Sequence, residues 1–268
     1  MLTAFNVEVL YDNIIYKKGK FQSVDWAAYV ALTDGDGNAV NFERVTVQTS
    51  ALNGEAQIVF SYRTSDGSEV DAQPVIMYLY YEVSSVEEWT AVNDDLSAWY
   101  AQTCDIDFAG CNLSASSLSI ARAVTADSPS SAKSFDGVYD GNGYALKNYI
   151  DTSKNYSSVF TQEVYVQSLF AKIGKRGKVR NLCLESVKIF SRNFTGLLVG
   201  ENYGTVSDVN LKDCEVLNMY GAGGLVAAYN YGNIYFTVIE NCNVRISNIQ
   251  NDYVLAFVNN GRIAQSLC

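Results

Sequence analysis

Apolar and polar residues alternate with a period of two through the last hundred residues of the chain, and the pattern repeats. Each repeat ends in a turn that closes on a glycine. The closing glycines are Gly177, Gly204, Gly232 and Gly261. They are 27, 28 and 29 residues apart, and a near-constant period of this length is typical of stacked repeats. The alternation predicts short strands with one buried face, and helical spacing does not fit it.

Aligning the repeats on their glycines predicts which side chains stack. Two apolar columns result, one of Leu184, Leu211 and Ile239 and one of Ile189, Val216 and Val244. A third column alternates in charge and consists of Glu185, Lys212 and Glu240. Opposite charges facing each other across strands favour this register. We therefore expect parallel strands about 4.8 Å apart in successive coils.

Small polar residues recur at two turns of each repeat. At the bend between two short strands they are Ser186, Asp213 and Asn241. Two residues before the closing glycine they are Asn202, Asn230 and Asn259. Such side chains tolerate left-handed backbone and bond to neighbouring backbone groups. We interpret both sets as structural, with the asparagines forming a ladder that satisfies buried turn backbone.

The repeats that close on Gly204, Gly232 and Gly261 resemble the GLUG-type repeats of bacterial surface and secreted proteins. That family is named for a Gly-Leu-x-Gly core like that of residues 196–200. Residues 135–150 look like the coil that precedes the first repeat in that family, and residues 100–108 resemble its opening strand. Ala227 and Ala228 depart from the pattern, which has a second glycine there. The resemblance covers roughly residues 85–268. It implies an extracellular right-handed parallel β-helix over residues 100–268, and we expect the last coil to be incomplete at Cys268.

Residues 1–83 differ from the repeats. Apolar alternating runs lie at residues 5–10, 27–32, 45–48, 57–62 and 75–83, and they are separated by turn-forming clusters. Short strands at this spacing predict an antiparallel sandwich. The segment 16–19 and the tyrosine-rich last run resemble a bacterial Ig-like module.

Residues 84–99 connect the two regions. Ser85 and Glu88 have the spacing of a capping box. They predict a short helix over residues 87–93, with Trp89 and Val92 on one side. An amphipathic helix at this place would cover the open end of a β-helix, whose strand edges are unpaired. We expect Trp89 and Trp99 to pack near that cap.

Composition excludes several classes of function. The chain has 268 residues, 48% of them hydrophobic, and a formal net charge of -10. Nucleic acid and anionic membranes require clustered positive charge, so neither is expected as a partner. The absence of histidine removes Ser-His-Asp and Cys-His catalysis and the usual zinc sites. Since no apolar run approaches 18 residues, we expect no membrane insertion, and we expect neither a metal nor a cofactor.

Acidic residues offer candidates for sugar chemistry and for calcium. Asp105 and Asp107 fall on one strand face about 7 Å apart, within the range of inverting glycosidases, and Asp94 and Asp95 form a second acidic pair. The acidic turns at residues 34–38 and 136–142 imitate parts of calcium loops. Turn formation explains both, and the first lacks a glutamate at the twelfth loop position. We expect no catalytic residue among them.

Six cysteines are present. Cys104 and Cys111 are close enough in sequence for a hairpin-like disulfide if the compartment is oxidising. Cys214 and Cys242 fall in one column of adjacent coils, where parallel side-chain directions favour buried free thiols.

Tyrosines are the candidate ligand-binding residues. Tyr203 and Tyr231 lie in register one coil apart, and Tyr139 and Tyr144 lie near the first coil. Aromatic faces with hydroxyl groups suit sugar rings and protein surfaces. The sequence therefore favours a non-enzymatic surface protein, an adhesin-like module or stalk that binds host or microbial glycans or matrix proteins. A carbohydrate-active enzyme or carbohydrate-binding module using the β-helix groove is one alternative, and a structural spacer is another. The oligomeric state stays open.

Overall fold

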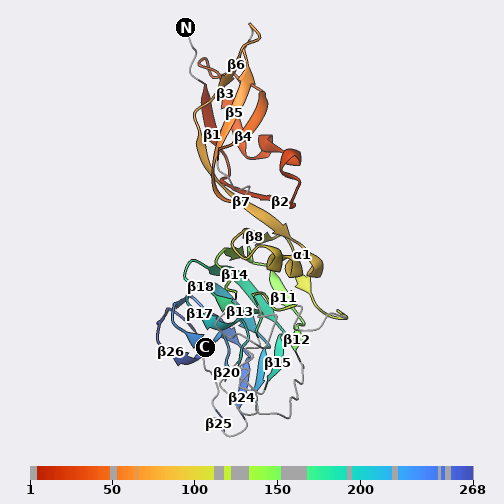
Figure 1. Ribbon diagram of the computed structural model, residues 1–268, viewed down its shortest axis with the longest axis vertical. Coiled ribbons are helices and arrows are strands. Elements are labelled where there is room, and N and C mark those ends of the chain that lie inside the picture. Colours follow the sequence, from red (N-terminus) through yellow and green to blue (C-terminus); the bar gives the residue numbers. More distant parts are fainter. Residues whose placement is uncertain are drawn as a thin grey trace. The chain divides into compact units, whose positions relative to one another are not determined.

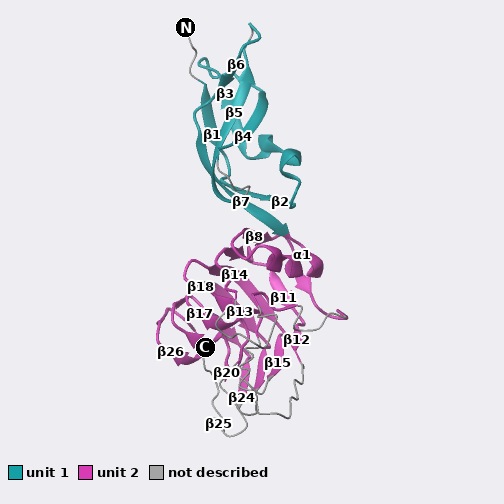
Figure 2. Cartoon of the chain, viewed as in Figure 1, with its two compact units in different colours: residues 1–82 teal, residues 83–268 magenta. Residues whose placement is uncertain are grey.

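The computed structural model describes residues 5–48, 53–64, 66–111, 118–121, 133–151, 168–191, 195–218, 223–246, 249–250 and 255–267 (Figure 1). The chain divides into two compact units, residues 1–82 and 83–268 (Figure 2). In the described residues, strands dominate both units and α1 (Val86–Ala91) is the single α-helix. The prediction of an all-β chain is confirmed. No described helix has the length and apolarity that crossing a membrane requires.

Unit 1 contains a two-stranded sheet and a larger one. The two-stranded sheet pairs β1 (Asn6–Val9) with β3 (Val30–Thr33) in antiparallel fashion. In the larger sheet, the antiparallel strands are β4 (Phe42–Val47), β5 (Gly54–Arg63), β6 (Glu69–Asp71) and β7 (Val75–Val83). The strand β2 (Asn13–Tyr16) pairs with β7 in parallel, contrary to the expectation of a purely antiparallel arrangement. The strand β2 has only four residues, which is too short for an alternation of apolar and polar residues to predict it.

A shared core joins the two sheets of unit 1. Ile14 of β2, Leu32 of β3 and Leu79 of β7 are all buried in it. Two short 3-10 helices, η1 (Phe21–Ser23) and η2 (Trp26–Ala28), close the core from one side. The Trp26 ring packs edge-on against Phe60 at a centroid distance of 5.6 Å. The sequence pattern predicted a strand over residues 27–32. Residues 27 and 28 belong to η2 instead, and the strand β3 begins at Val30.

Unit 2 is built from parallel strands that the chain visits in turn. Its largest set consists of β8 (Trp99–Gln102), β9 (Ile106–Asp107), β10 (Val138–Asp140), β11 (Ala145–Lys147), β14 (Lys178–Glu185), β18 (Thr205–Lys212), β22 (Asn233–Tyr235), β23 (Val238–Glu240) and β27 (Arg262–Ala264). A second set consists of β12 (Ile150–Asp151), β15 (Lys188–Ser191), β19 (Glu215–Asn218) and β24 (Asn243–Ile246), with β25 (Ile249–Gln250) antiparallel to β24. The third consists of β13 (Phe170–Ile173), β17 (Val199–Asn202), β21 (Ala227–Asn230) and β26 (Ala256–Asn259), and β16 (Thr195–Gly196) pairs with β20 (Gly223–Gly224) separately.

The predicted register of unit 2 is confirmed. Leu184 pairs with Leu211 and Leu211 with Ile239, and the column extends upstream to Leu146 and Ile106. All five side chains are buried. The charged column also extends upstream, and its signs alternate over Asp107, Lys147, Glu185, Lys212 and Glu240. Apolar burial and cross-strand charge therefore favour the same register.

Left-handed residues recur at two corners of each pass through unit 2. The first corner is the predicted bend between two short strands. At this corner, φ is 57° at Ser186, 55° at Asp213 and 51° at Asn241. There, Asn241 Nδ2 donates a hydrogen bond of 2.5 Å to Asp213 Oδ1. The second corner consists of Asn181, Asp208, Phe236 and Gln265, with φ between 50° and 56°. Small polar residues adopt this conformation readily, whereas Phe236 is an unusual occupant.

The closing glycines form a column of close backbone contacts. A Cβ atom on Gly204 would overlap the carbonyl oxygen of Gly177, and one on Gly232 would overlap the carbonyl oxygen of Gly204. Gly261 has the same relation to Gly232. Successive turns therefore pack backbone on backbone, with no room for a side chain at these positions.

The helix α1 begins at the predicted capping box. Ser85 Oγ accepts a hydrogen bond from Glu88 N at 3.2 Å, and Glu88 Oε2 accepts one from Ser84 N at 2.7 Å. Trp89 is fully buried and donates from Nε1 to the carbonyl of Leu118 at 2.7 Å. Its ring packs edge-on against three aromatic rings of unit 2, those of Phe108, Tyr139 and Phe170. The helix and the burial of Trp89 are confirmed, while Trp99 is half-buried at the start of β8.

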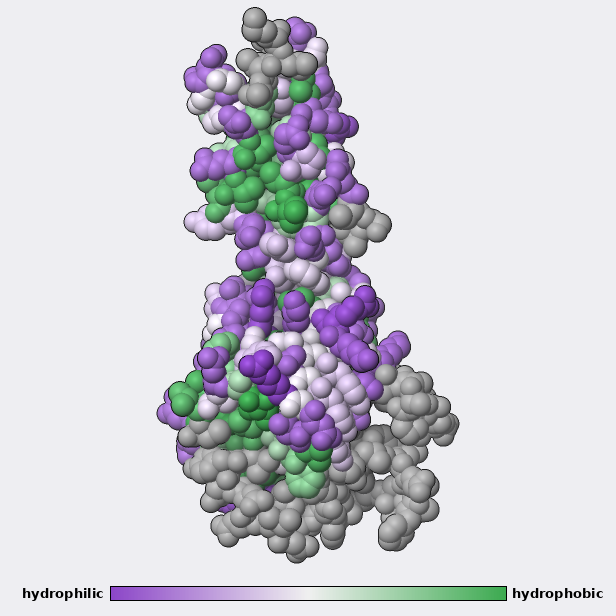
Figure 3. Space-filling model, turned by 90° about the vertical axis from the view of Figure 1, so that its left-hand side faces the viewer, coloured by the Kyte–Doolittle hydropathy of each residue, from purple (hydrophilic) through white to green (hydrophobic). Residues whose placement is uncertain are grey.

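Large apolar side chains that remain exposed occur in both units. Ile76 in unit 1 is 51% exposed, and Phe236 and Leu267 in unit 2 are 48% and 71% exposed. Figure 3 shows apolar surface between polar side chains on one face of each unit.

Replacing Gly232 with alanine tests the backbone contact. The new Cβ would also lie 2.7 Å from Tyr203 C and 2.9 Å from Gly204 N, both backbone atoms that cannot move aside. We expect Gly232→Ala to lower the free energy of unfolding by about 3 kcal/mol, at the upper end for overpacking. Gly143→Ala is the control, since Gly143 has φ of 82° and open space around it, and it should cost about 1 kcal/mol. Urea unfolding of the full chain measures both, and equal costs would contradict the packing.

Candidate functional site

A ladder of asparagines links the ends of three strands of the third set, β17, β21 and β26. Asn202 Nδ2 donates to Asn230 Oδ1 at 2.8 Å, and Asn230 Nδ2 donates to Asn259 Oδ1 at 2.7 Å. Asn202 and Asn230 are fully buried. Asn202 Oδ1 also accepts from Gly204 N at 3.1 Å. Asn202 and Asn230 therefore bond both to the next turn and to backbone carbonyl groups, which holds the two turns in one conformation.

Tyrosines directly follow the first two asparagines of the ladder, Asn202 and Asn230. The rings of Tyr203 and Tyr231 stack with a centroid distance of 4.8 Å and an interplanar angle of 15°. Tyr229, on β21, stacks beside Tyr231 at 6.3 Å and 8°. Tyr231 is 41% exposed, and the other two rings are partly exposed. These three side chains are called the tyrosine face.

Tyr229 is not among the tyrosines predicted from the sequence, although the sequence carries a signal for it. Tyr229 pairs with Glu201 across the strands and lies two residues before Tyr231. In a strand of period two, it therefore points outward like Glu201. Extending the alignment from the turn into the strand would have found it.

Charged groups border the tyrosine face. Lys172 Nζ lies 4.9 Å from the centroid of the Tyr203 ring and 3.3 Å from Glu201 Oε2. The first contact has the geometry of a cation–π interaction. The pKa values of Tyr203 and Tyr229 are both raised, mainly because the two side chains are partly buried. Their hydroxyl groups therefore stay protonated at neutral pH and can donate hydrogen bonds to a ligand.

The structure places the other two candidate tyrosines differently. Tyr139 is fully buried and packs against Trp89 and Phe170 at centroid distances of 5.3 and 5.7 Å. The prediction that Tyr139 contacts a ligand is therefore wrong, because its ring fills the interior beside α1. Its pairing with the inward-facing Val179 explains the orientation. Tyr144 is 37% exposed and lies on the turn between β10 and β11.

The acidic pair considered for sugar cleavage is engaged in structural bonds. Asp105 accepts from Lys147 Nζ at 2.7 Å and from Ala145 N at 2.9 Å. Asp107 accepts from Asn148 Nδ2 and Ala109 N, both at 2.8 Å. Hydrogen bonding, led by Lys147 for Asp105 and by Asn148 for Asp107, lowers the pKa of both carboxyl groups. An inverting glycosidase needs one carboxyl group with a raised pKa, which neither of these provides.

The remaining acidic candidates also have partners within their own turns. Asp34 Oδ1 accepts from Asp36 N at 3.0 Å and Asn38 N at 2.8 Å, as in an Asx turn. Asp140 binds Arg180 Nε at 2.8 Å and Asn142 N at 2.9 Å. The acidic pair at residues 94–95 includes a carboxylate that accepts from the backbone at residue 97. Among the described residues, no cluster of three or more Cys, Asp or Glu side chains could hold a metal ion.

The five described cysteines are free thiols. Cys104 Sγ lies 3.2 Å from the carbonyl oxygen of Ser84, and it forms no disulfide with Cys111. Cys214 and Cys242 are buried free thiols, as expected from their shared column, and Cys214 N donates to Cys242 Sγ at 3.4 Å. Cys268 lies outside the described residues.

Comparisons with known proteins give little similarity. No protein-family model matches the sequence, and no curated protein matches it. A solved structure titled "IgA1 Protease" aligns with a TM-score of 0.45 and 14% sequence identity. The alignment covers 88% of this chain and 18% of that chain, so the present chain spans less than a fifth of its length. Similarity at this level does not establish a shared fold.

Titration of the acidic pair tests its structural role. We expect both Asp105 and Asp107 to titrate below the ordinary value of about 3.9 in the full chain. Since folding lowers their pKa, the stability that they add is complete above about pH 4 and is lost as the pH falls through the lowered values. Lys147→Gln should raise the pKa of Asp105 more than that of Asp107, for which Lys147 is the smallest contributor. Carboxyl-detected NMR measures these values, and a midpoint above about 5 for either aspartate would contradict the assignment.

Proposed function

We propose that this chain is a non-enzymatic binding module whose tyrosine face contacts a glycan or a protein surface. The observation that carries the proposal is the stack of Tyr203, Tyr229 and Tyr231, which are held in register and partly exposed. Aromatic rings with hydroxyl groups offer both an apolar face and hydrogen-bonding groups to such ligands.

The proposed fold supports this function. We propose that unit 2 is a right-handed parallel β-helix of the GLUG type and that unit 1 is an Ig-like sandwich. The parallel pairing of residues 27, 28 and 29 apart, from Lys178 through Thr205 and Asn233 to Arg262, supports the first assignment. The shared core of two mostly antiparallel sheets supports the second. In such a protein, equivalent positions recur once per coil, so a ligand would meet the rings of Tyr203 and Tyr231 on two successive coils.

Rigidity gives the tyrosine face its advantage as a binding surface. Tyr203 N donates to the carbonyl of Ile173 at 2.9 Å, and Tyr231 N donates to that of Asn202 at 2.8 Å. Backbone that is already ordered loses little entropy when a ligand binds. We expect modest affinity that is spread over several side chains, as for an adhesin-like module at the surface of a bacterium or in its secretions.

Two alternatives remain as outcomes of the test. A carbohydrate-active enzyme would need a proton donor, and the lowered pKa values of Asp105 and Asp107 argue against that role for them. A structural spacer would not need exposed stacked rings. We therefore rank the binding module first, with glycans or matrix proteins as ligands and no metal or cofactor.

Binding of the purified chain to an array of glycans and matrix proteins tests the proposal. Product analysis accompanies every glycan that binds. We expect saturable binding without turnover, and Tyr231→Ala should weaken it about tenfold, since one aromatic contact contributes about 1.5 kcal/mol at most. Tyr231→Phe should retain most of the affinity, because the ring face remains.

Tyr11→Ala is the matched control. Tyr11 is 69% exposed and lies in unit 1, outside the tyrosine face. Its removal should leave the affinity unchanged. Cleavage of a bound glycan would contradict the non-enzymatic assignment, and equal losses in both alanine variants would show that the tyrosine face is not the site.

A further inference from the structure

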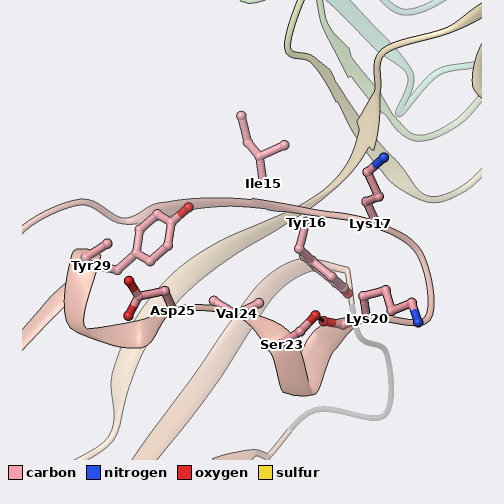
Figure 4. Close-up of a pocket in the computed structure, with 9 residues that line it drawn as sticks. Ile15, Tyr16, Lys17, Lys20, Ser23, Val24, Asp25 and Tyr29 are labelled. Carbon is pink, nitrogen blue, oxygen red and sulfur yellow. Dashed lines mark hydrogen bonds between the residues drawn. The ribbon is translucent and has the colours of Figure 1, made fainter.

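The pocket of unit 1 does not select a ligand. Its volume is about 290 Å³, and it is lined by β2, the turn after β2 and the helices η1 and η2 (Figure 4). Lys17 and Lys20 are among its lining residues, but their side chains point away from it and from each other (Figure 4). The ammonium groups therefore do not converge on one binding point, and the chemistry that the proposed function leaves unused lies in unit 2.

Unit 2 holds a pair of buried thiols one pass of the chain apart. Cys214 and Cys242 immediately precede Glu215 and Asn243, which are partners in the parallel pairing of β19 with β24. Neighbouring strands are about 4.8 Å apart, within the range of Cα separations that a disulfide spans. Asn243 N donates to the carbonyl of Cys214 at 2.9 Å, and Cys214 N donates to Cys242 Sγ at 3.4 Å. The Cys242 sulfur therefore already lies against Cys214.

The two sulfur atoms differ in their surroundings. Each lies near the carbonyl two residues before it, Cys214 Sγ at 3.2 Å from Lys212 O and Cys242 Sγ at 3.3 Å from Glu240 O. Cys242 Sγ also accepts the amide of Cys214, and such a donor stabilises a thiolate. Cys214 Sγ instead lies 3.5 Å from a second carbonyl, that of Leu184, which favours the protonated thiol. Cys242 is therefore the thiol that ionises first.

The pKa values of the pair agree with this assignment. The hydrogen bond between the two side chains lowers the pKa of Cys242 to about 7 and raises the pKa of Cys214. Access favours the same residue, since Cys242 is 8% exposed and Cys214 is 1% exposed. Asn241, which precedes Cys242 at the left-handed corner, is exposed. A small reagent therefore meets Cys242 first.

We propose that Cys214 and Cys242 form an oxidative modification site, at which a small organic disulfide converts the two thiols into a disulfide between successive passes. The Cys242 thiolate attacks one sulfur of the reagent, which forms a mixed disulfide and releases one thiolate. The Cys214 thiol then loses its proton and attacks Cys242 Sγ, and the second half of the reagent leaves as a thiolate. The two cysteines together lose two electrons, the reagent gains them, and the two protons end on the released thiols.

The new bond would tie together the two passes that carry the stacked tyrosines. Cys214 follows Tyr203 by 11 residues, and Cys242 follows Tyr231 by 11 residues. Side chains of neighbouring parallel strands point the same way, so both thiols must rotate to form the bond, and strained disulfides of this kind are readily reduced again. The proposal goes beyond the proposed function, since oxidation needs no ligand at the tyrosine face.

Oxidation of the full chain by hydroxyethyl disulfide tests the proposal. This reagent is small and uncharged, so the net charge of -10 does not repel it. After the remaining thiols are blocked, trypsin and a glutamate-specific protease together cut residues 213–215 and 241–245 into separate fragments. We expect mass spectrometry to find these two fragments joined, and to find them separate after treatment with dithiothreitol.

Alanine variants test the order of the two steps. In Cys214→Ala, the remaining Cys242 should accumulate as a mixed disulfide with half of the reagent. In Cys242→Ala, the remaining Cys214 should react about tenfold more slowly, because the thiolate is the nucleophile. Circular dichroism verifies that both variants fold. Cys183→Ala is the control, since Cys183 is a partly exposed thiol on β14, and its removal should leave the bond between Cys214 and Cys242 unchanged.

Several results would overturn the proposal. These are an absence of joined fragments from the native chain, joined fragments that form only in urea, or faster modification of Cys214 than of Cys242 in the two alanine variants. Glycan binding is measured separately through Tyr231→Ala, so failure of one proposal leaves the other standing.

Discussion

Direct packing of backbone on backbone at the closing glycines is the constraint on which unit 2 depends. Gly204, Gly232 and Gly261 each lie against the carbonyl of the preceding closing glycine, and the amide ladder of Asn202, Asn230 and Asn259 runs beside them. If the pairing of neighbouring strands shifted by one residue, a side chain would lie where each closing glycine packs, and the asparagine ladder would break. Such a shift would also turn the apolar column through Leu184 to the outside. The turn thus sets the register, and the register sets which side chains are buried, paired or exposed.

The tyrosine face is a consequence of that register. Tyr203 and Tyr231 follow the ladder directly, so their rings stack because their backbones stack. The same packing engages two acidic residues of unit 2: Asp105 and Asp107 accept hydrogen bonds from Ala145 N and Asn148 Nδ2, and hydrogen bonding lowers the pKa of both carboxyl groups.

Sequence alone predicted the features that repeat. The columns through Leu211 and Val216 and the left-handed residues at Asp213 and Asn241 follow from the spacing, because each sequence repeat carries its own copy of the pattern. Features that occur once were missed. The strand β2 is too short to show alternation, and Tyr139 is inward-facing because it pairs with Val179, in a coil outside the regular repeat.

Amide hydrogen exchange of the full chain tests most directly whether the asparagine ladder holds the tyrosine face rigid. The amides of Tyr203, Gly204 and Tyr231 are all hydrogen-bonded in the turns that carry the tyrosines. They should exchange as slowly as the amides of β14 and β18, through the same unfolding event. The turn at Gly37, which is exposed, provides a fast reference. Exchange of the three amides at the rate of Gly37 would contradict the account, because the tyrosine face would then be a loose turn rather than part of the stack.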